Sequence, residues 1–399
     1  MSAPISMNTL HRVPALDAVR VIGALAVVGH HVGFATGVNT GGGSWAGWLA
    51  RLDSGVAVFF VLSGFLLFRP WAHAQAIGGD KPATGRYLWR RAMRVLPAYW
   101  VAVVVCLLVL DRNDDATGAD WVRHFTLTQV YTRDNLEHGL SQTWSLCTEV
   151  AFYALLPVIA ALLTLGRKRT GRPWVIAAGG IVLTGIWVAL IAAGLLSPSL
   201  HTMWLPAYGL WFGAGMILAA VHVDLRNGQR PRWRFLDEIA AAPVACWVAA
   251  LAVYAISTTP IAGPLDLAEP TATEFAIKMM LYTLLAVLIT VPLAFGPHTR
   301  AKEAFGSAPG RWLGTISYGL FLWHPFVLEM FYQLTGRPEF TGGFWFTYVV
   351  VAGGGLVLAA GSYYLIERPA QRFSHRWPRP RRPRTTESQS ATAVPTAVS

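Results

Sequence analysis

The first apolar run, residues 15–36, contains four polar side chains that are costly to place in hydrocarbon: Asp17, Arg20, His30 and His31. Arg20 and His31 are eleven residues apart, which on an α-helix is about three turns, so they share a face about 16 Å apart. His30 points elsewhere. A guanidinium binds phosphate through a bidentate fork, and a histidine can take a proton from a hydroxyl near neutral pH. The pair predicts a phosphate anchor and a general base.

The same two residues also allow a purely structural interpretation. Arg20 would then extend to the membrane interface, and His31 would be a polar packing residue. The separation of about 16 Å, from the helical rise per residue, is similar to the length of a pantetheine arm. It therefore favours a carrier whose phosphates contact Arg20 while its thioester reaches His31.

Glu149 is the second costly residue, near the start of the apolar run 145–165. We expect it at a depth similar to that of His31, where a carboxylate could orient the imidazole and stabilise its protonated form. The alternatives are a carboxyl kept neutral by burial or one paired with a structural base. Nearby Cys147 could be an acyl-accepting nucleophile, but a packing role is favoured.

Further candidates lie on three later segments. Arg90, Arg91 and Arg94 precede or open the run 93–110, and Arg91 and Arg94 are spaced to share a helix face. They could join Arg20 around the phosphates of coenzyme A, although anchoring at the cytoplasmic interface would also explain them. The other candidates are Ser63, Tyr318 and His324, and His324 is followed by Pro325. Each of these three residues could contact the substrate or could serve only in helix packing.

The composition indicates a membrane protein. Of the 399 residues, 54% are hydrophobic and only 13% are charged, against roughly 25% charged in typical soluble domains. A helix needs about 20 mostly apolar residues to cross the hydrocarbon core. The sequence therefore predicts an all-α polytopic membrane protein with ten transmembrane helices, at residues 15–36, 54–71, 93–110, 145–165, 173–196, 201–222, 240–258, 272–295, 311–333 and 344–366.

The basic residues predict the orientation, because Lys and Arg accumulate in cytoplasmic loops. The connections after the second, fourth, sixth, eighth and tenth runs are basic, and the others hold few bases. Both termini are therefore expected in the cytoplasm, with residues 1–14 as the N-terminal segment, 15–370 as the membrane domain and 371–399 as a basic tail. The part of the tail from Arg376 is rich in Pro, Arg, Ser and Thr, so we expect it to be disordered.

Several other classes of protein are disfavoured. The net charge of +11 could indicate nucleic-acid binding, but the bases lie between apolar runs rather than on one soluble face. Residues 1–10 lack the features of a removable signal peptide, so the first run should stay in the membrane.

The outer connection 111–143 should contain a short amphipathic segment around Trp121 and Phe125. No metal site is expected, because neither metal-ligand nor disulfide spacing is found for the cysteines, Cys106, Cys147 and Cys246.

Taken in order, these residues resemble the acyltransferase 3 family of membrane O-acyltransferases. The resemblance covers nearly the whole chain and rests on Arg20 and His31 with ten residues between them, GVAVFFVLSGF at 55–65, RRAMRVLP at 90–97, TWSLCTE at 143–149, Ser317-Tyr318 with His324, and IERP at 366–369. It implies acyl-CoA as donor, a sugar-like acceptor of the cell envelope or a glycosylated metabolite, and His31 as the catalytic histidine.

The chain departs from the family pattern in two respects. Ala57 stands where an acidic residue is common after Gly-Val, so any role of that acid cannot be carried over. Some members carry a fused extracytoplasmic esterase-like domain, whereas we expect this membrane core to act alone or with a separate partner.

The hypothesis from the sequence is a bacterial plasma-membrane O-acyltransferase. It would move an acyl group, with acetyl favoured, from cytoplasmic acyl-CoA to a carbohydrate, glycolipid or glycosylated metabolite. His31 and Glu149 would be catalytic, Arg20, Arg91 and Arg94 would bind the coenzyme, and the acceptor contacts would be Ser63, Tyr318 and His324. The alternative is a proton-coupled transporter of a small polar solute, which also places ionisable residues inside a helical bundle.

Overall fold

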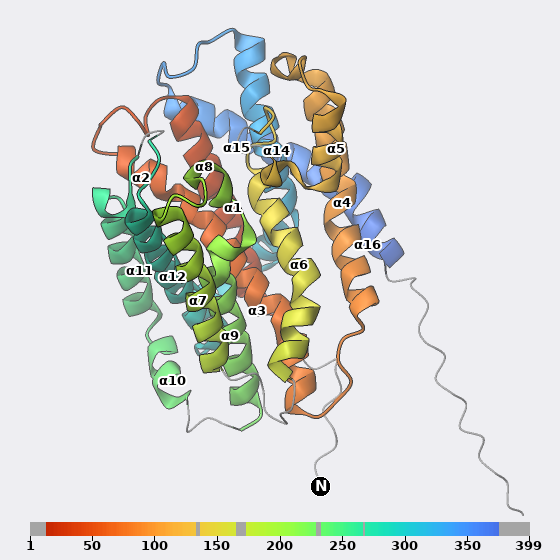
Figure 1. The fold of residues 1–399 in the computed structure, drawn as a ribbon, viewed down its shortest axis with the longest axis vertical. Helices are drawn as coiled ribbons and strands as arrows, with labels where there is room; N and C mark the ends of the chain where they lie inside the picture. Colours follow the sequence, from red (N-terminus) through yellow and green to blue (C-terminus); the bar gives the residue numbers. More distant parts are fainter. Residues whose placement is uncertain (1–12, 133–135, 165–172, 229–232, 266–267, 375–399) are drawn as a thin grey trace, which may run out of the picture.

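A bundle of long helices makes up the computed structural model of the chain, which describes residues 13–132, 136–164, 173–228, 233–265 and 268–374 (Figure 1). The disorder expected for the tail from Arg376 falls outside these residues. The described helices are α1 (Ala15–Ala35), α2 (Ala46–Ala50), α3 (Ser54–Ala76), α4 (Thr84–Val109), α5 (Gly118–Thr126), α6 (Thr143–Thr164), α7 (Pro173–Ala192), α8 (Pro198–His201), α9 (Gly209–Arg226), α10 (Arg234–Ala240), α11 (Pro243–Ser257), α12 (Ala272–Phe295), α13 (Arg300–Phe305), α14 (Ala308–Thr335), α15 (Phe344–Ser362) and α16 (Arg368–Ser374).

The prediction of an all-helical membrane protein is confirmed at this level. In the described part of the chain, eight helical segments are long and apolar enough to cross a membrane, and α10 and α11, bent by 82°, would make a ninth if they count as one span. The eight contain α1, α3, α4, α6, α7, α9, α12 and α15. Helix α14 corresponds to the predicted run 311–333 but is not among them.

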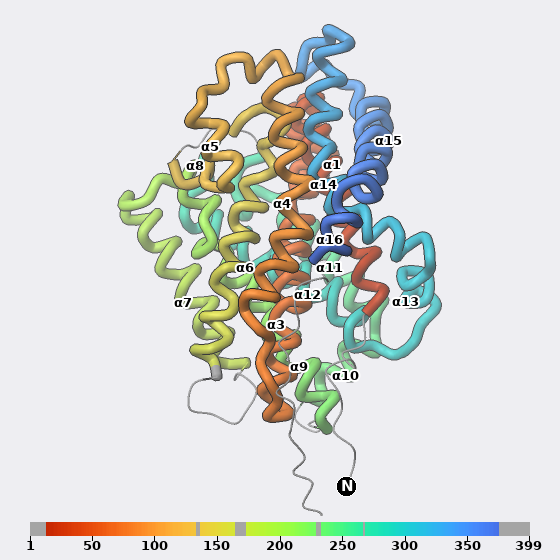
Figure 2. Tube along the Cα trace, turned by 90° about the vertical axis from the view of Figure 1, so that its right-hand side faces the viewer, coloured from red at the N-terminus to blue at the C-terminus, as the bar shows by residue number. Residues whose placement is uncertain are grey.

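Two helix boundaries differ from the sequence prediction in ways that affect the site. Helix α4 begins at Thr84, nine residues earlier than expected, so Arg91 and Arg94 lie two to three turns inside a helix. Beyond α15 the helix continues through a π-helical turn, Tyr363–Glu367, into α16, which packs against α4 (Figure 2). The short segment expected in the outer connection is present as α5, which begins with a capping box between Thr117 and Asp120.

Glycines allow the helices that carry the candidate residues to approach one another closely. A side chain added at Gly215 of α9 would overlap the Val61 carbonyl of α3, and one at Gly314 of α14 would overlap the Asp17 backbone of α1. Small residues serve this purpose in membranes, where lipid tails are as apolar as the helices and close van der Waals packing drives association. The positions of α1, α3 and α14 therefore depend on these contacts.

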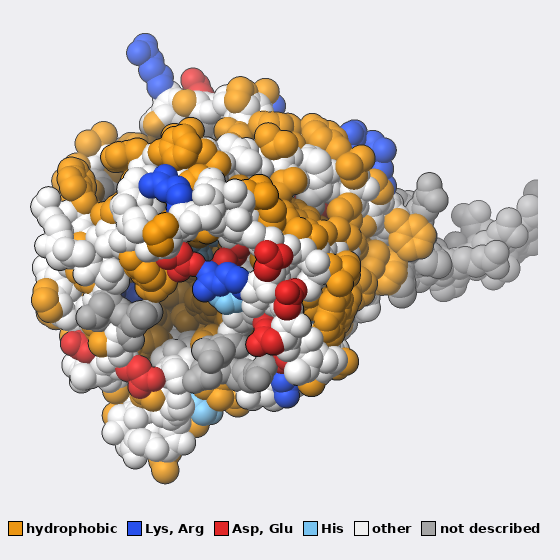
Figure 3. Space-filling model, turned by 90° about the horizontal axis from the view of Figure 1, so that it is seen from above, with side chains coloured by type: hydrophobic (Ala, Val, Ile, Leu, Met, Phe, Trp, Pro, Cys, Tyr) orange, Lys and Arg blue, Asp and Glu red, His pale blue; other side chains and the backbone are white. Residues whose placement is uncertain are grey.

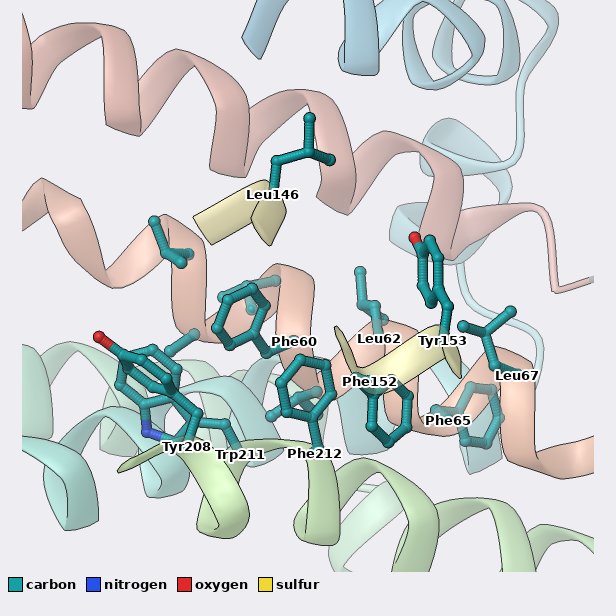
Figure 4. Packing of buried hydrophobic residues seen from close by; sticks show 14 of the residues in the cluster. Phe60, Leu62, Phe65, Leu67, Leu146, Phe152, Tyr153, Tyr208, Trp211 and Phe212 are labelled. Atoms are coloured by element: carbon teal, nitrogen blue, oxygen red, sulfur yellow. The ribbon is translucent and has the colours of Figure 1, made fainter. Parts of the chain in front are cut away.

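Stacked aromatic rings fill the core between α3, α6 and α9. The ring of Phe212 stacks on Phe60 with centroids 4.5 Å apart and on Phe152 at 4.1 Å, while Tyr208 and Trp211 extend the layer (Figure 4). Offset stacking at such distances is favourable beyond the area that the rings bury. The layer makes a rigid wall behind the polar residues of α1 and α14.

We predict that Gly215→Leu destabilises the bundle, because the added side chain must separate α3 from α9. Overpacking of a well-packed core costs about 1–3 kcal/mol or more, which should appear as a lower unfolding temperature in detergent. The matched control is Gly185→Leu, since that exposed glycine of α7 has no atom near the new side chain. Equal unfolding temperatures for the two variants would contradict the close-packing account.

Candidate functional site

Two histidines from different helices are hydrogen-bonded to each other. His31 Nδ1 on α1 lies 3.1 Å from His324 Nε2 on α14 and 2.9 Å from the Val27 carbonyl oxygen. His324 is fully buried, and its Nδ1 lies 3.1 Å from the Leu320 carbonyl. The Nδ1 of His30 instead bonds to the Ala50 carbonyl at 2.8 Å, while the His30 ring lies edge to face with that of His31, with centroids 5.3 Å apart.

Local sequence on α14 and α15 makes room for this pair. Pro325 follows His324 and lacks the N–H that would normally bond the carbonyl of Phe321, one turn earlier. That carbonyl is thereby released from the usual backbone hydrogen bond, and the His324 ring bonds to the adjacent Leu320 carbonyl. On the other side, Gly355 of α15 lies against the His324 backbone, so α15 can approach closely. The ring of His324 is consequently held from its own helix and projects toward α1.

Glu149 does not occupy the position expected for it. Its carboxylate accepts a hydrogen bond from the Ser63 hydroxyl, and it lines a small cavity of 40 Å³ together with Arg20 and Tyr318. Tyr318 precedes His324 by six residues, or about 9 Å along α14, so Glu149 is nearer than His31 to the end of the bundle at which α14 begins. The expected Glu149–His31 pair is therefore replaced by His324–His31. The prediction failed because the register between α6 and α1 is decided by packing.

The small cavity is bounded by residues that the sequence had marked separately. Besides Arg20, Glu149 and Tyr318, its lining includes Ser317 of α14 and Phe59 of α3. The Tyr318 hydroxyl donates to the Val95 carbonyl at 2.9 Å, which ties α14 to α4. Phe321 closes the cavity toward the histidines, since its ring lies 5.8 Å from Phe59 and 6.1 Å from His324.

A larger polar cavity of 440 Å³ begins on the other side of Arg20. Four arginines from three helices line it: Arg20 of α1, Arg69 of α3, and Arg91 and Arg94 of α4. Arg91 and Arg94 are brought to Arg20 as the helical spacing predicted, whereas the neighbouring Arg90 is exposed. The Asp17 carboxylate also lines the cavity, but four guanidinium groups outnumber it and repel one another, so the site favours a ligand with several negative charges.

Arg69 is a candidate that sequence reasoning missed. It is only 7% exposed, and neither its Nε nor its Nη1 has a hydrogen-bond partner in the described part of the chain. Its guanidinium lies over the Phe65 ring, 5.4 Å from the centroid, but buried nitrogens without hydrogen bonds are costly unless a ligand satisfies them. The sequence feature that could have identified Arg69 is its position one helical turn after Phe65, the last residue of the SGF sequence.

The opposite end of the bundle carries a mixture of charges around a hollow. From the end at which α5 lies, the surface is recessed, with basic, acidic and His side chains around the recess (Figure 3). Lys278 of α12 forms an ion pair with Asp53 at 2.7 Å, and Tyr282 also donates to Asp53. Buried Arg51 donates to the Ser257 carbonyl at 2.8 Å, so it is a structural residue that joins α11 to the start of α3.

Two other features carry no candidate chemistry. An apolar cavity of 520 Å³ between α6, α7 and α9 is larger than the basic one, but its lining, which includes Phe152 and Phe212, offers no acid, base or phosphate ligand other than a tyrosine hydroxyl. Cys147 is buried, which suits the packing role favoured for it. Among the residues described, no group of three or more His, Cys, Asp or Glu could hold a metal ion.

A family model for an acyltransferase domain matches residues 13–364, which include the histidine pair, the four arginines and Glu149. The chain belongs to this acyltransferase family. The match identifies an acyltransferase domain in this chain, and the resemblance given by its motifs is confirmed. With its apolar helices, it is a multi-pass membrane protein.

Several curated proteins are similar over most of this chain. Peptidoglycan O-acetyltransferase OatA of Listeria monocytogenes is 22% identical over 383 residues, and putative peptidoglycan O-acetyltransferase YrhL of Bacillus subtilis is 26% identical over 381; each alignment covers 90% of this chain. The chain spans about half the length of these two relatives, 56% and 55%. Putative membrane-bound transacylase BcsY of Komagataeibacter xylinus is 28% identical, over 84% of this chain and 80% of its own length. No solved structure matches.

We predict that the arginine-lined cavity binds inorganic pyrophosphate, and that Arg69→Gln weakens this binding. A hydrogen bond to a charged group contributes about 1.5–3 kcal/mol, so the dissociation constant should rise about 10- to 100-fold. Isothermal titration of the purified protein measures it. Arg90→Gln, which removes an exposed arginine of α4, is the control and should bind as the wild type does. Equal weakening by both variants would mean that only the net charge matters.

Proposed function

We propose that the protein transfers an acyl group from cytoplasmic acyl-CoA to a hydroxyl of a carbohydrate or glycolipid on the other side of the membrane. The observation that carries this proposal is the order of the polar sites along the bundle. The four-arginine cavity comes first, and the small cavity with Glu149 and Tyr318 comes next; Arg20 lines both. The histidine pair lies beyond the small cavity. This order matches a ligand with phosphates at one end and a reactive thioester at the other.

The donor would enter from the arginine-lined cavity. The pyrophosphate and 3′-phosphate of the donor would neutralise the positive charges of the four arginines that line this cavity. Guanidinium groups bind phosphate oxygens in a bidentate fashion. The pantetheine arm would pass Arg20, which lines both cavities. Because the inner cavity is only 40 Å³, side chains around it, including Phe59 and Phe321, would have to move when the arm enters.

His31 would act as the general base. Its Nε2 takes the proton of the acceptor hydroxyl while the acceptor oxygen bonds to the thioester carbonyl carbon. The carbon–sulfur bond then breaks, and the departing thiolate receives that proton from His31, so the base is regenerated and coenzyme A leaves as a thiol. Ser63 and Tyr318, together with Glu149, form the polar wall that the thioester passes, and in this proposal Glu149 acts on the donor side rather than on His31.

The acceptor would approach from the end of the bundle at which α5 lies, where the surface is recessed (Figure 3). This arrangement requires the ten-helix topology with both termini in the cytoplasm, which the distribution of Lys and Arg supports. The names of two relatives support an envelope sugar as the acceptor and acetyl as the group transferred. The bacterial sources of these relatives support a bacterial plasma membrane as the location.

We predict that the purified protein releases coenzyme A from labelled acetyl-CoA when a suitable glycan is supplied. His31→Ala should bind the donor normally but lose turnover by about 100-fold or more, since general-base catalysis contributes about 10²–10⁴-fold. Arg20→Ala should lose both binding and turnover. Labelled product and thiol release are measured in parallel.

The competing transporter hypothesis makes the opposite prediction for the same preparation. Solute flux into proteoliposomes with neither binding of acetyl-CoA nor release of thiol would refute the proposed reaction. Arg90→Ala is the control, because Arg90 is exposed on α4 and does not line the arginine cavity.

A further inference from the structure

We propose that His324 is a positioning residue that, together with the Val27 carbonyl, fixes which nitrogen of His31 carries the proton. It keeps the proton on Nδ1 of His31 and leaves Nε2 bare, so that Nε2 can accept the proton of the incoming hydroxyl. The catalytic consequence rests on the proposed function, but the proton positions themselves do not. The inference assigns His324 a role different from the substrate contact expected from the sequence.

The argument begins with the two backbone carbonyls. A carbonyl oxygen can only accept a hydrogen bond, so the ring nitrogen close to it must be the one that carries hydrogen. Nδ1 of His324 lies 3.1 Å from the Leu320 oxygen, and Nδ1 of His31 lies 2.9 Å from the Val27 oxygen. Both rings are therefore protonated at Nδ1, each anchored to the preceding turn of its own helix.

The contact between the rings then has only one consistent form. A neutral His324 with hydrogen on Nδ1 has a lone pair on Nε2, and this lone pair faces Nδ1 of His31 at 3.1 Å. The His31 N–H is thus shared between the Val27 oxygen and the His324 nitrogen. The reverse arrangement, with His324 donating from Nε2, would leave a bare His31 Nδ1 facing the Val27 oxygen, so that two lone pairs would oppose each other.

Burial explains why a neutral histidine serves here instead of a carboxylate. His324 is fully buried, and an unpaired charge at such a position is expensive. The Asp53 carboxylate, just before α3, is already paired with Lys278. A neutral acceptor fixes the orientation and tautomer of His31 without adding a charge, and it still stabilises the imidazolium formed when Nε2 takes a proton, because Nδ1 remains a donor.

Histidine nitrogens can be observed directly by nuclear magnetic resonance of protein labelled with ¹⁵N in its imidazole rings and reconstituted in lipid. The signals of His31 and His324 are assigned by their loss in His31→Gln and His324→Gln. We expect both residues to show a protonated Nδ1 and a bare Nε2, with a nitrogen–nitrogen coupling across the hydrogen bond between His31 Nδ1 and His324 Nε2. A proton on Nε2 of either neutral ring would overturn the proposal.

Activity variants test the consequence for catalysis. His324→Phe removes the acceptor and should lower kcat by about 10- to 100-fold, as loss of a partner that orients a functional histidine commonly does, while KM for acyl-CoA stays unchanged. His324→Gln offers an amide oxygen as acceptor and should retain more activity than His324→Phe. Equal loss in the two variants, or a rise in KM without a fall in kcat, would refute a positioning role.

The control is His222→Phe. His222 is another buried histidine, on α9, and its ring contacts Phe65 and Phe295. It should leave both the coupling and kcat unchanged. If the coupling is present but no acyl transfer is found with any donor, the proposed function fails and the proton assignment stands. If transfer occurs without the coupling, the positioning role fails alone.

Discussion

An ionisable side chain inside hydrocarbon is stable only where other polar groups, water or a ligand surround it. This constraint governs the interior of the bundle. His31 is satisfied by His324 and a backbone carbonyl, and Glu149 is satisfied by Ser63. Arg69 has no such partner for two of its nitrogens in the described residues, and it lies in the cavity where a polyanion would supply one. The polar groups are thus of two kinds: some have hydrogen-bond partners within the fold, and others have polar atoms that a bound ligand would satisfy.

Close helix packing brings these groups to their positions. Helix α1 carries Arg20 and His31, and α14 lies against it where Gly314 allows the backbones to meet. Helix α3, which carries Ser63 and Arg69, is fixed against α9 by Gly215 on one side and by the aromatic layer around Phe212 on another. Glycine contacts and stacked rings tolerate little displacement, and a small displacement would separate the hydrogen-bonding partners.

The polar residues also differ in how they can change charge. Arginine remains protonated at any pH that the protein meets, which suits the anchoring of phosphates. Histidine can take up and release a proton within one reaction cycle, which suits the end of the site where a hydroxyl must be deprotonated. The separation of arginines at one end from histidines at the other therefore gives a direction along the bundle, from donor anchor to reaction centre.

The sequence by itself determined the properties that depend on local spacing and composition. It established the helices, because apolar runs of about 20 residues leave few other structures possible in a membrane. It also predicted that Arg20 and His31 share a face and that Arg91 joins Arg94, since both follow from the helical period. Only the tertiary structure decided which residues meet across helices. The depth of Glu149, the pairing of His324 with His31 and the burial of Arg69 depend on the relative registers of α1, α3, α6 and α14. Those registers are decided by glycine contacts and ring packing between segments far apart in the chain, which no local pattern encodes.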